Sequence, residues 1–123
     1  MFSRKFDPLI AKYPNDAAPL GRVAQYFASR ESSGKQVDSV RLTLDRLREI
    51  AGVDNRTSLA NLVALLTSEN ILKRYLLVKS PTGDGIAEFE SIDQVPSLIH
   101  DTYRDVDLEI TPELLHTLYR VMP

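Results

Sequence analysis

The chain has 123 residues, with 15 Lys or Arg, 17 Asp or Glu, a net charge of −2 and no cysteine. A chain of this length can bury about two-thirds of the surface that it exposes when unfolded, so it needs no disulfide to hold its core. The absence of cysteine excludes a disulfide framework, a thiolate metal site and a cysteine nucleophile. No apolar run approaches the roughly 20 residues that span a bilayer, and the first residues lack the apolar block of a secretory signal. We therefore expect a cytoplasmic protein without a membrane partner.

Residues 1–15 are expected to form an N-terminal arm with one short helix. Asp7 can cap a helix that begins at Pro8, and large apolar side chains stand on both sides of this cap. Phe2 and Phe6 are interface candidates, because such an arm packs either on its own core or on a partner. A membrane-surface role is disfavoured, since Asp7 and Pro8 interrupt the apolar stretch.

Residues 16–91 carry the pattern of three helices followed by a hairpin. Apolar residues recur at helical spacing over residues 16–30, 43–51 and 57–69. Thr43 can cap the second helix, and Gly52 can end it because glycine tolerates positive φ. The buried stripe expected for the third helix is Leu59, Leu62, Val63 and Leu66.

Two strands are predicted after the third helix. Residues 75–79 and 86–89 flank the segment 80–85, whose Pro and Gly residues are typical of a hairpin turn. Between helix and strand, Asn70 occupies the position where a helix-ending residue with positive φ is favoured. This turn is the candidate wing of the module described below.

Residues 92–123 are expected to form a C-terminal extension of one strand and one helix. Residues 92–99 are apolar but contain Pro96, which indicates a short helix or turn, and apolar and acidic residues then alternate over 105–110 as in a half-buried strand. The sequence Thr111, Pro112, Glu113 is typical of a helix start. Leu115 and Leu118 on that helix are interface candidates, because the extension either covers the chain's own core or contacts another subunit.

The elements predicted over residues 42–90 come in the order helix, tight turn, helix and hairpin. The sequence of this segment is LTLDRLREIAGVDNRTSLANLVALLTSENILKRYLLVKSPTGDGIAEFE. Residues 37–90 therefore resemble the winged helix-turn-helix superfamily, with residues 40–42 in the place of its short first strand. The resemblance implies an α+β, mostly helical fold, with a winged-helix core of three helices plus a β-hairpin wing in a single domain that spans residues 1–123. It also implies a module that binds nucleic acid or protein and does not catalyse a reaction.

The resemblance further implies that a DNA-binding form of the module would read DNA with helix 57–69 and the 80–85 wing. That helix has one basic residue at its start, Asp84 lies in the wing, and the chain's pI of about 5.6 is far below the value of ~9 often exceeded by nucleic-acid-binding domains. In favour of DNA, residues 1–80 have a net charge of +5, whereas residues 81–123 have a net charge of −7. The nucleic-acid-binding candidates are Arg46, Asn55, Arg56, Thr57, Ser58, Asn61, Lys73, Arg74 and Lys79.

Candidate catalytic residues are few. His100 and His116 lie on different predicted elements, and neither has a second histidine or a cysteine at metal-ligand spacing. The segment TGDGIAE lacks the Lys and the following Ser or Thr of a phosphate-binding loop. We therefore predict no catalytic residue, metal, cofactor or small-molecule substrate.

Two functions remain open on this evidence. The first is a non-enzymatic adaptor or regulatory subunit that binds another protein subunit or a second copy of itself. The second is a dimeric DNA-binding transcriptional regulator. The acidic wing and the long extension favour the first function, whereas Arg56, Asn61 and the basic N-terminal portion favour the second.

Overall fold

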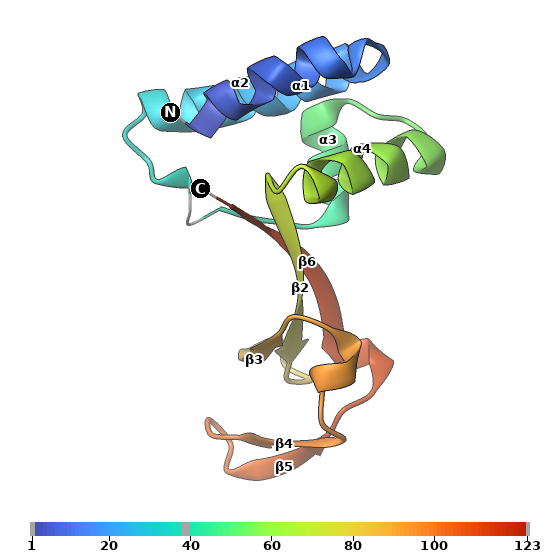
Figure 1. Cartoon of the computed structure of the whole chain (residues 1–123). Coiled ribbons are helices and arrows are strands. Elements are labelled where there is room, and N and C mark those ends of the chain that lie inside the picture. The colour runs from blue at the N-terminus through green and yellow to red at the C-terminus, as the bar shows by residue number, and fades with distance from the viewer. Residues whose placement is uncertain (1, 38–39, 123) are drawn as a thin grey trace. The chain divides into compact units, whose positions relative to one another are not determined.

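The computed structural model describes residues 2–37 and 40–122 and has an α+β fold (Figure 1). The chain, expected to form one domain, groups into two compact units: residues 1–73 with 119–123, and residues 74–118. Two long strands, β2 (Leu72–Lys79) and β6 (Leu115–Val121), have residues in both units. Residues 38 and 39, within the segment 37–90 discussed above, lie outside the described residues. In the described ranges, no helix is both long and apolar enough to cross a membrane.

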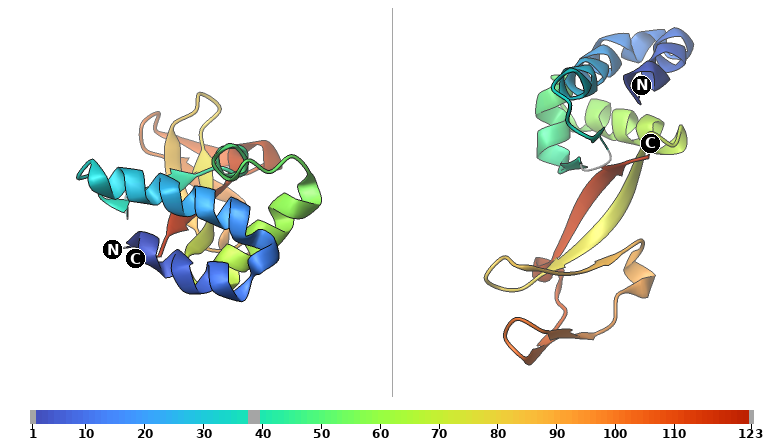
Figure 2. Two further views of the ribbon diagram at one scale, coloured as in Figure 1. Left: turned by 90° about the horizontal axis from the view of Figure 1, so that it is seen from above. Right: turned by 90° about the vertical axis from the view of Figure 1, so that its left-hand side faces the viewer.

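The first unit is built from four helices. α1 (Phe6–Lys12) follows the 3-10 turn η1 (Phe2–Lys5), and α2 (Ala17–Ser32) follows the 3-10 turn η2 (Pro14–Asp16). α1 and α2 lie side by side in both views of Figure 2, and α2 also packs on α3 (Leu44–Ala51). α4 (Arg56–Ser68) completes the set. The predicted helices over 16–30, 43–51 and 57–69 are therefore confirmed, with small shifts at their ends.

The helix ends follow from local chemistry. The Arg46 N–H donates to the Thr43 hydroxyl oxygen at 3.1 Å, and Gly52 ends α3 with a φ of 67°, which confirms both predictions. Asn70 has the expected positive φ, 58°. α4 begins one or two residues earlier than predicted, because the Ser58 N–H donates to the Asn55 side-chain oxygen at 2.8 Å. At α1 the prediction was wrong: Asp7 lies inside the first turn and does not cap it.

The side of α4 that faces the core differs in part from the predicted stripe. Leu62 and Leu66 are buried as expected, and Leu65 is buried beside them. Leu59 and Val63 are only half-buried. Val63 still packs against the core, so the assignment to the buried stripe was wrong for Leu59 and right in part for Val63. Both positions lie at helical spacing from the true core residues, and only the elements that pack on α4 decide which side of the apolar stripe is covered.

The N-terminal arm belongs to the core of the first unit. Phe2 and Phe6 are 8% and 0% exposed, and both rings contact Phe27 of α2, with ring centroids 4.8 and 6.0 Å apart. Of the two arrangements that the sequence left open, packing on the chain's own core is the one observed. Their burial removes Phe2 and Phe6 from the accessible interface candidates.

The main sheet is antiparallel, with the strand order β1-β6-β2-β3. β1 (Arg41–Leu42) pairs with the end of β6, Leu42 opposite Tyr119, and the Met122 N–H donates to the Ile71 carbonyl at 2.8 Å. β2 and β3 (Gly85–Phe89) form the predicted hairpin, with an irregular register between Val78 and Lys79. The strand beside β1 is thus β6, from the C-terminal end of the chain.

The C-terminal extension differs most from the prediction. β4 (Leu98–Asp101) and β5 (Val106–Glu109) pair as a second hairpin, so only η4 (Ile92–Gln94) remains of the turn or helix expected over 92–99. The strand predicted over 105–110 is confirmed. The predicted C-terminal helix is wrong: η5 (Pro112–Leu114) makes a single turn and β6 follows. Leu115 and Leu118 are half-buried residues of this strand, because pairing with distant strands outweighs the local helix-start signal.

Candidate functional site

An open, mainly apolar groove lies on the first unit between α3 and α4. Its volume is about 630 Å³. The half-buried Leu59 and Val63 line it together with Ala60 and Ala64. None of these four α4 residues has a polar side chain. We call this surface the α3–α4 groove. Its lining residues are Leu44, Asp45, Arg48, Arg56, Leu59, Ala60, Val63, Ala64 and Tyr119.

Charged residues also line the α3–α4 groove. Arg48 of α3 and Arg56 of α4 are exposed, and neither forms an ion pair within the described part of the chain. Among the described residues of the lining, Asp45 is the one acidic group. A segment that combines apolar side chains with carboxylates would meet matching chemistry here, because it could bury apolar area while it neutralises two guanidinium groups.

The residues predicted to bind nucleic acid differ in their surroundings: some make contacts within the chain, some are exposed on α4, and they belong to both units. Asn55 caps α4, and Arg46 is held by Glu49, with their charged atoms 3.2 Å apart, and by the Tyr26 ring at 5.6 Å. Thr57, Ser58 and Asn61 are exposed on α4, and Arg56 lines the groove. Lys73 belongs to the first unit, whereas Arg74 and Lys79 belong to the second.

The groove residues Leu59, Ala60, Val63 and Ala64 were missed as a site by sequence reasoning. Two of them were assigned to the core, and alanine is too small and too common in helices to indicate a binding surface. A signal was nevertheless present, since Ala60 and Ala64 are one helical turn apart beside two large apolar residues. That pattern is typical of a helix whose apolar stripe is wider than one core can cover.

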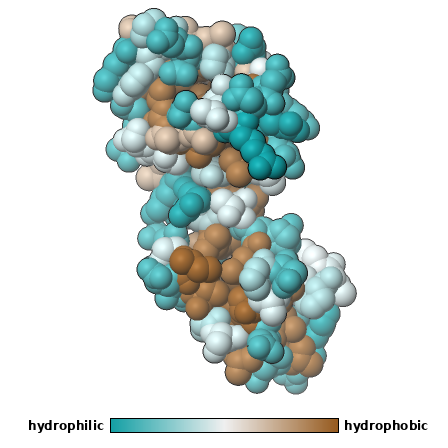
Figure 3. All heavy atoms as spheres, turned by 90° about the vertical axis from the view of Figure 1, so that its right-hand side faces the viewer, coloured by the Kyte–Doolittle hydropathy of each residue, from teal (hydrophilic) through white to brown (hydrophobic). Residues whose placement is uncertain are grey.

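The two units differ in charge as well as in composition. The first unit contains 12 basic and 8 acidic residues, a net charge of +4, and the second contains 3 basic and 9 acidic residues, a net charge of −6. The second unit also exposes large apolar side chains, namely Ile92, Leu98, Tyr103 and Val106. Figure 3 shows apolar surface gathered on this unit, in the lower part of the picture. The charge asymmetry seen along the sequence therefore follows the division into units.

A polar network holds the loops of the second unit. Asp101 is fully buried, and one of its oxygens accepts from the Arg104 guanidinium at 3.0 Å while the other accepts from the Tyr103 N–H at 3.0 Å. Arg104 also donates to Asp84 at 2.8 Å, to the Ser80 hydroxyl at 3.3 Å and to the Thr82 hydroxyl. The hydrogen bond from Arg104 lowers the pKa of Asp84. This network ties the β2–β3 turn to the β4–β5 turn.

His100 takes part in a separate group on the β4–β5 hairpin. Its Nδ1 lies 2.9 Å from Asp107, the residue directly opposite in the hairpin, and its Nε2 lies 3.0 Å from Asp105. The hydrogen bond with Asp107 raises the pKa of His100. Asp107 was not identified as a neighbour of His100 from the sequence, because residues 98–101 were not predicted to be the strand that pairs with residues 106–109.

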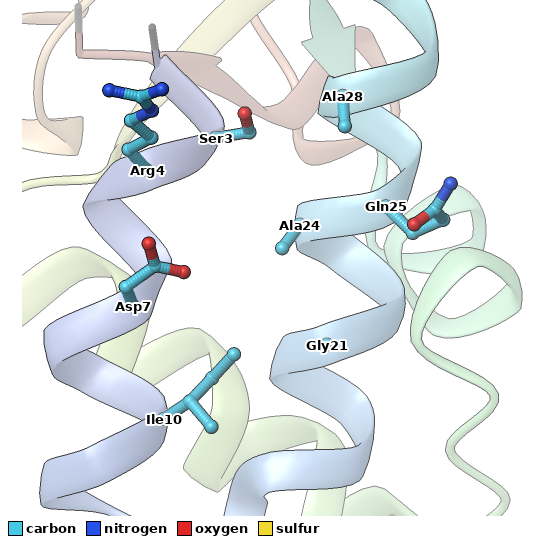
Figure 4. Close-up of a pocket in the computed structure, with 8 residues that line it drawn as sticks. All are labelled: Ser3, Arg4, Asp7, Ile10, Gly21, Ala24, Gln25 and Ala28. Carbon is cyan, nitrogen blue, oxygen red and sulfur yellow. The ribbon is translucent and has the colours of Figure 1, made fainter.

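A second, smaller groove of about 260 Å³ runs between α1 and α2 (Figure 4). Gly21, Ala24 and Ala28 of α2 form one wall, and Arg4 and Asp7 lie on the other. A Cβ added at Gly21 would meet no atom within 4 Å, so the small side chains of this wall leave the groove open. Within residues 2–37 and 40–122, no three His, Asp or Glu side chains are arranged to hold a metal ion.

Comparison of the chain with protein-family models, with curated proteins and with solved structures gave no match. The interpretation of the α3–α4 groove therefore depends on its own geometry and chemistry.

Proposed function

We propose that this chain is a non-enzymatic binding module of the winged-helix type, and that it serves as a small adaptor or regulatory subunit of a larger protein assembly. Two features support the fold part of this proposal. Three helices, α2, α3 and α4, precede β2, and the short strand β1 pairs with a later strand, β6. Residues 74–118 come between β2 and β6 in the chain. The wing of the module would then be this whole segment, not the β2–β3 turn alone.

The observation that carries the proposal is the apolar surface of α4. A DNA reader of this type presents polar and basic side chains from the second helix of the turn motif to base edges and phosphates. At the corresponding helix of this chain, the α3–α4 groove offers Leu59, Ala60, Val63 and Ala64. Apolar side chains gain little from contact with phosphates but can bury area against a protein segment, at about 25 cal/mol per Å² removed from water. This surface is suited to a protein partner.

DNA binding is the second candidate, and the charge of the first unit favours it. Its net charge of +4 and the exposed Arg56 and Asn61 on α4 are compatible with duplex DNA. Against it, Arg46 and Asn55 are already engaged, and the net charge of the second unit is −6. Affinity for DNA depends largely on phosphate neutralisation, so an acidic wing would weaken it.

Fluorescence anisotropy with mixed-sequence duplex DNA separates these two functions. The adaptor proposal expects no binding at about 50 mM salt, where phosphate-driven affinity is strongest. Micromolar binding that weakens steeply by about 200 mM salt, and that is lost when Arg46 and Arg56 are reversed to glutamate, would replace the adaptor by the DNA-binding regulator.

A photocrosslinking amino acid at position 60 tests the protein-binding surface directly. Ala60 is exposed in the α3–α4 groove, so a benzophenone side chain can be introduced there without disturbing the core. In cells that produce the chain, we expect one defined protein adduct from position 60. The matched control is the same probe at the exposed Lys35, outside the groove, which should give none. Equal labelling from both positions, or none from position 60, would contradict the proposal.

A further inference from the structure

The tip of the β4–β5 hairpin, residues 102–107, presents apolar and acidic side chains together. Tyr103 is 74% exposed and Val106 is 45% exposed, the former in the turn and the latter at the start of β5. Asp105 and Asp107 flank Val106 and are also exposed, with His100 as their neighbour. Large exposed aromatic residues are costly to leave in water and are enriched at the centres of protein interfaces.

The tip is held in one conformation by contacts that leave Tyr103 outside. The Tyr103 N–H is bound to the buried Asp101, and the next residue, Arg104, is bound to Asp101 and Asp84. Asp105 has a φ of 55°, which fixes the turn. A tip that is rigid before binding loses less conformational entropy when it docks. The network of the second unit thus fixes an exposed Tyr103, and His100 contacts the carboxylates of Asp105 and Asp107 next to it.

The α3–α4 groove has the complementary chemistry. It offers apolar side chains for Tyr103 and Val106, and Arg48 and Arg56 for the two carboxylates. The units that carry the two surfaces have net charges of +4 and −6, which favours their encounter in solution.

From this complementarity we infer that the occupant of the α3–α4 groove is the β4–β5 tip of a second copy of the chain, with Tyr103 as its anchor. The inference rests on the proposed protein-binding function and names the partner. The contact joins two different surfaces, so each copy contributes a groove to one neighbour and a tip to the same or another neighbour. The chain therefore associates with itself in a concentration-dependent manner.

The test uses sedimentation velocity of the full chain from about 1 to 200 µM, a range that brackets micromolar self-association. A groove variant carries Arg56→Glu and Ala60→Glu, and a tip variant carries Tyr103→Ser and Val106→Ser. All four positions are exposed, so both variants are expected to fold, which circular dichroism verifies. We expect self-association of the wild type, and at least tenfold weaker association of each variant alone. Lys35→Glu, a charge reversal outside the groove, should leave association unchanged.

The decisive sample is the equimolar mixture of the two variants. The groove variant retains an intact tip and the tip variant retains an intact groove, so one productive contact remains and a one-to-one complex should form. A mixture that stays monomeric, or association that persists in each variant alone, would overturn the inference.

A wild-type chain that is monomeric at 200 µM would overturn the inference as well, but not by itself the proposed function. In that case an adduct from position 60 to a different protein would keep the adaptor proposal and replace only the partner. Absence of any protein adduct would contradict both.

Discussion

The two units of this chain are stabilised by different kinds of interaction. The first unit buries apolar side chains from all four helices, and Phe27 lies at the contact of Phe2 and Phe6. In the second unit, the buried residues include the polar Ser80 and Asp101 as well as Tyr75 and Val78, and an arginine bridges its turns. A segment as short as residues 74–118 buries too small a fraction of its apolar surface to depend on burial alone. One chain thus combines a mainly apolar core with a unit whose turns are joined by charged hydrogen bonds.

The largest expected effect is in the apolar core. Phe27→Ala should lower the free energy of unfolding of the first unit by about 3 to 5 kcal/mol, because it removes a buried ring and leaves a cavity between Phe2 and Phe6. Urea unfolding followed by circular dichroism measures the loss. Tyr103→Ala, which removes an exposed ring, is the matched control and should change stability by less than about 0.5 kcal/mol at low micromolar concentration. Equal losses in the two variants would mean that Phe27 is not a core residue.

The next effect concerns the polar network. Asp101→Ala should destabilise the second unit by about 1.5 to 3 kcal/mol, because it leaves the Tyr103 N–H without its acceptor and removes the buried carboxylate that Arg104 contacts. Hydrogen exchange should accelerate at the amides of β4 and β5 and remain unchanged in α2 and α4. Asp101→Asn retains an oxygen acceptor and should have the smaller effect. Faster exchange throughout both units would refute a network that acts locally.

Two glycines of the first unit should respond with opposite signs. Gly52→Ala should cost about 1 kcal/mol, since its φ of 67° is unfavourable for alanine. A Cβ there would also lie 3.4 Å from the Arg22 side chain. Gly21→Ala, within α2 and with open space around the new Cβ, should raise stability by about 0.5 to 1 kcal/mol. Thermal unfolding of the two variants in parallel gives the comparison, and destabilisation of similar size at both positions would contradict it.

The smallest expected effect is a pH dependence of the β4–β5 hairpin. The hydrogen bond with Asp107 raises the pKa of His100 above its ordinary value of 6.5, so the folded hairpin binds the proton more tightly than the unfolded chain. This contribution is complete below about pH 6.5 and is lost as the pH rises through the higher pKa of the folded state. Between about pH 6 and 8, hydrogen exchange of the β5 amides should therefore accelerate more than the intrinsic pH dependence of amide exchange predicts. In Asp107→Asn, this additional acceleration should be smaller.

α2, α3, α4 and several of their ends were predictable because their signals are local. Thr43, Gly52 and Asn70 act on residues within one turn of themselves, and the apolar spacing of α2, α3 and α4 requires only the helical period. The β2–β3 hairpin was predictable for the same reason, since its turn residues join adjacent strands. The candidate site was only partly predictable: Arg56 was identified, but Leu59 and Val63 were assigned to the core.

What the sequence alone determined is thus the order of the elements in residues 16–91, the unequal distribution of charge and the absence of cysteine chemistry. Only the tertiary structure decided that residues 115–121 form a strand, that His100 faces Asp107 and that Leu59 lines a groove. Each of these depends on residues that are distant in the chain or on the neighbours that pack on an element. Leu115 and Leu118 are three residues apart, a spacing that favours one face of a helix, so pairing of β6 with β1 and β2 supplied the free energy that selected the strand.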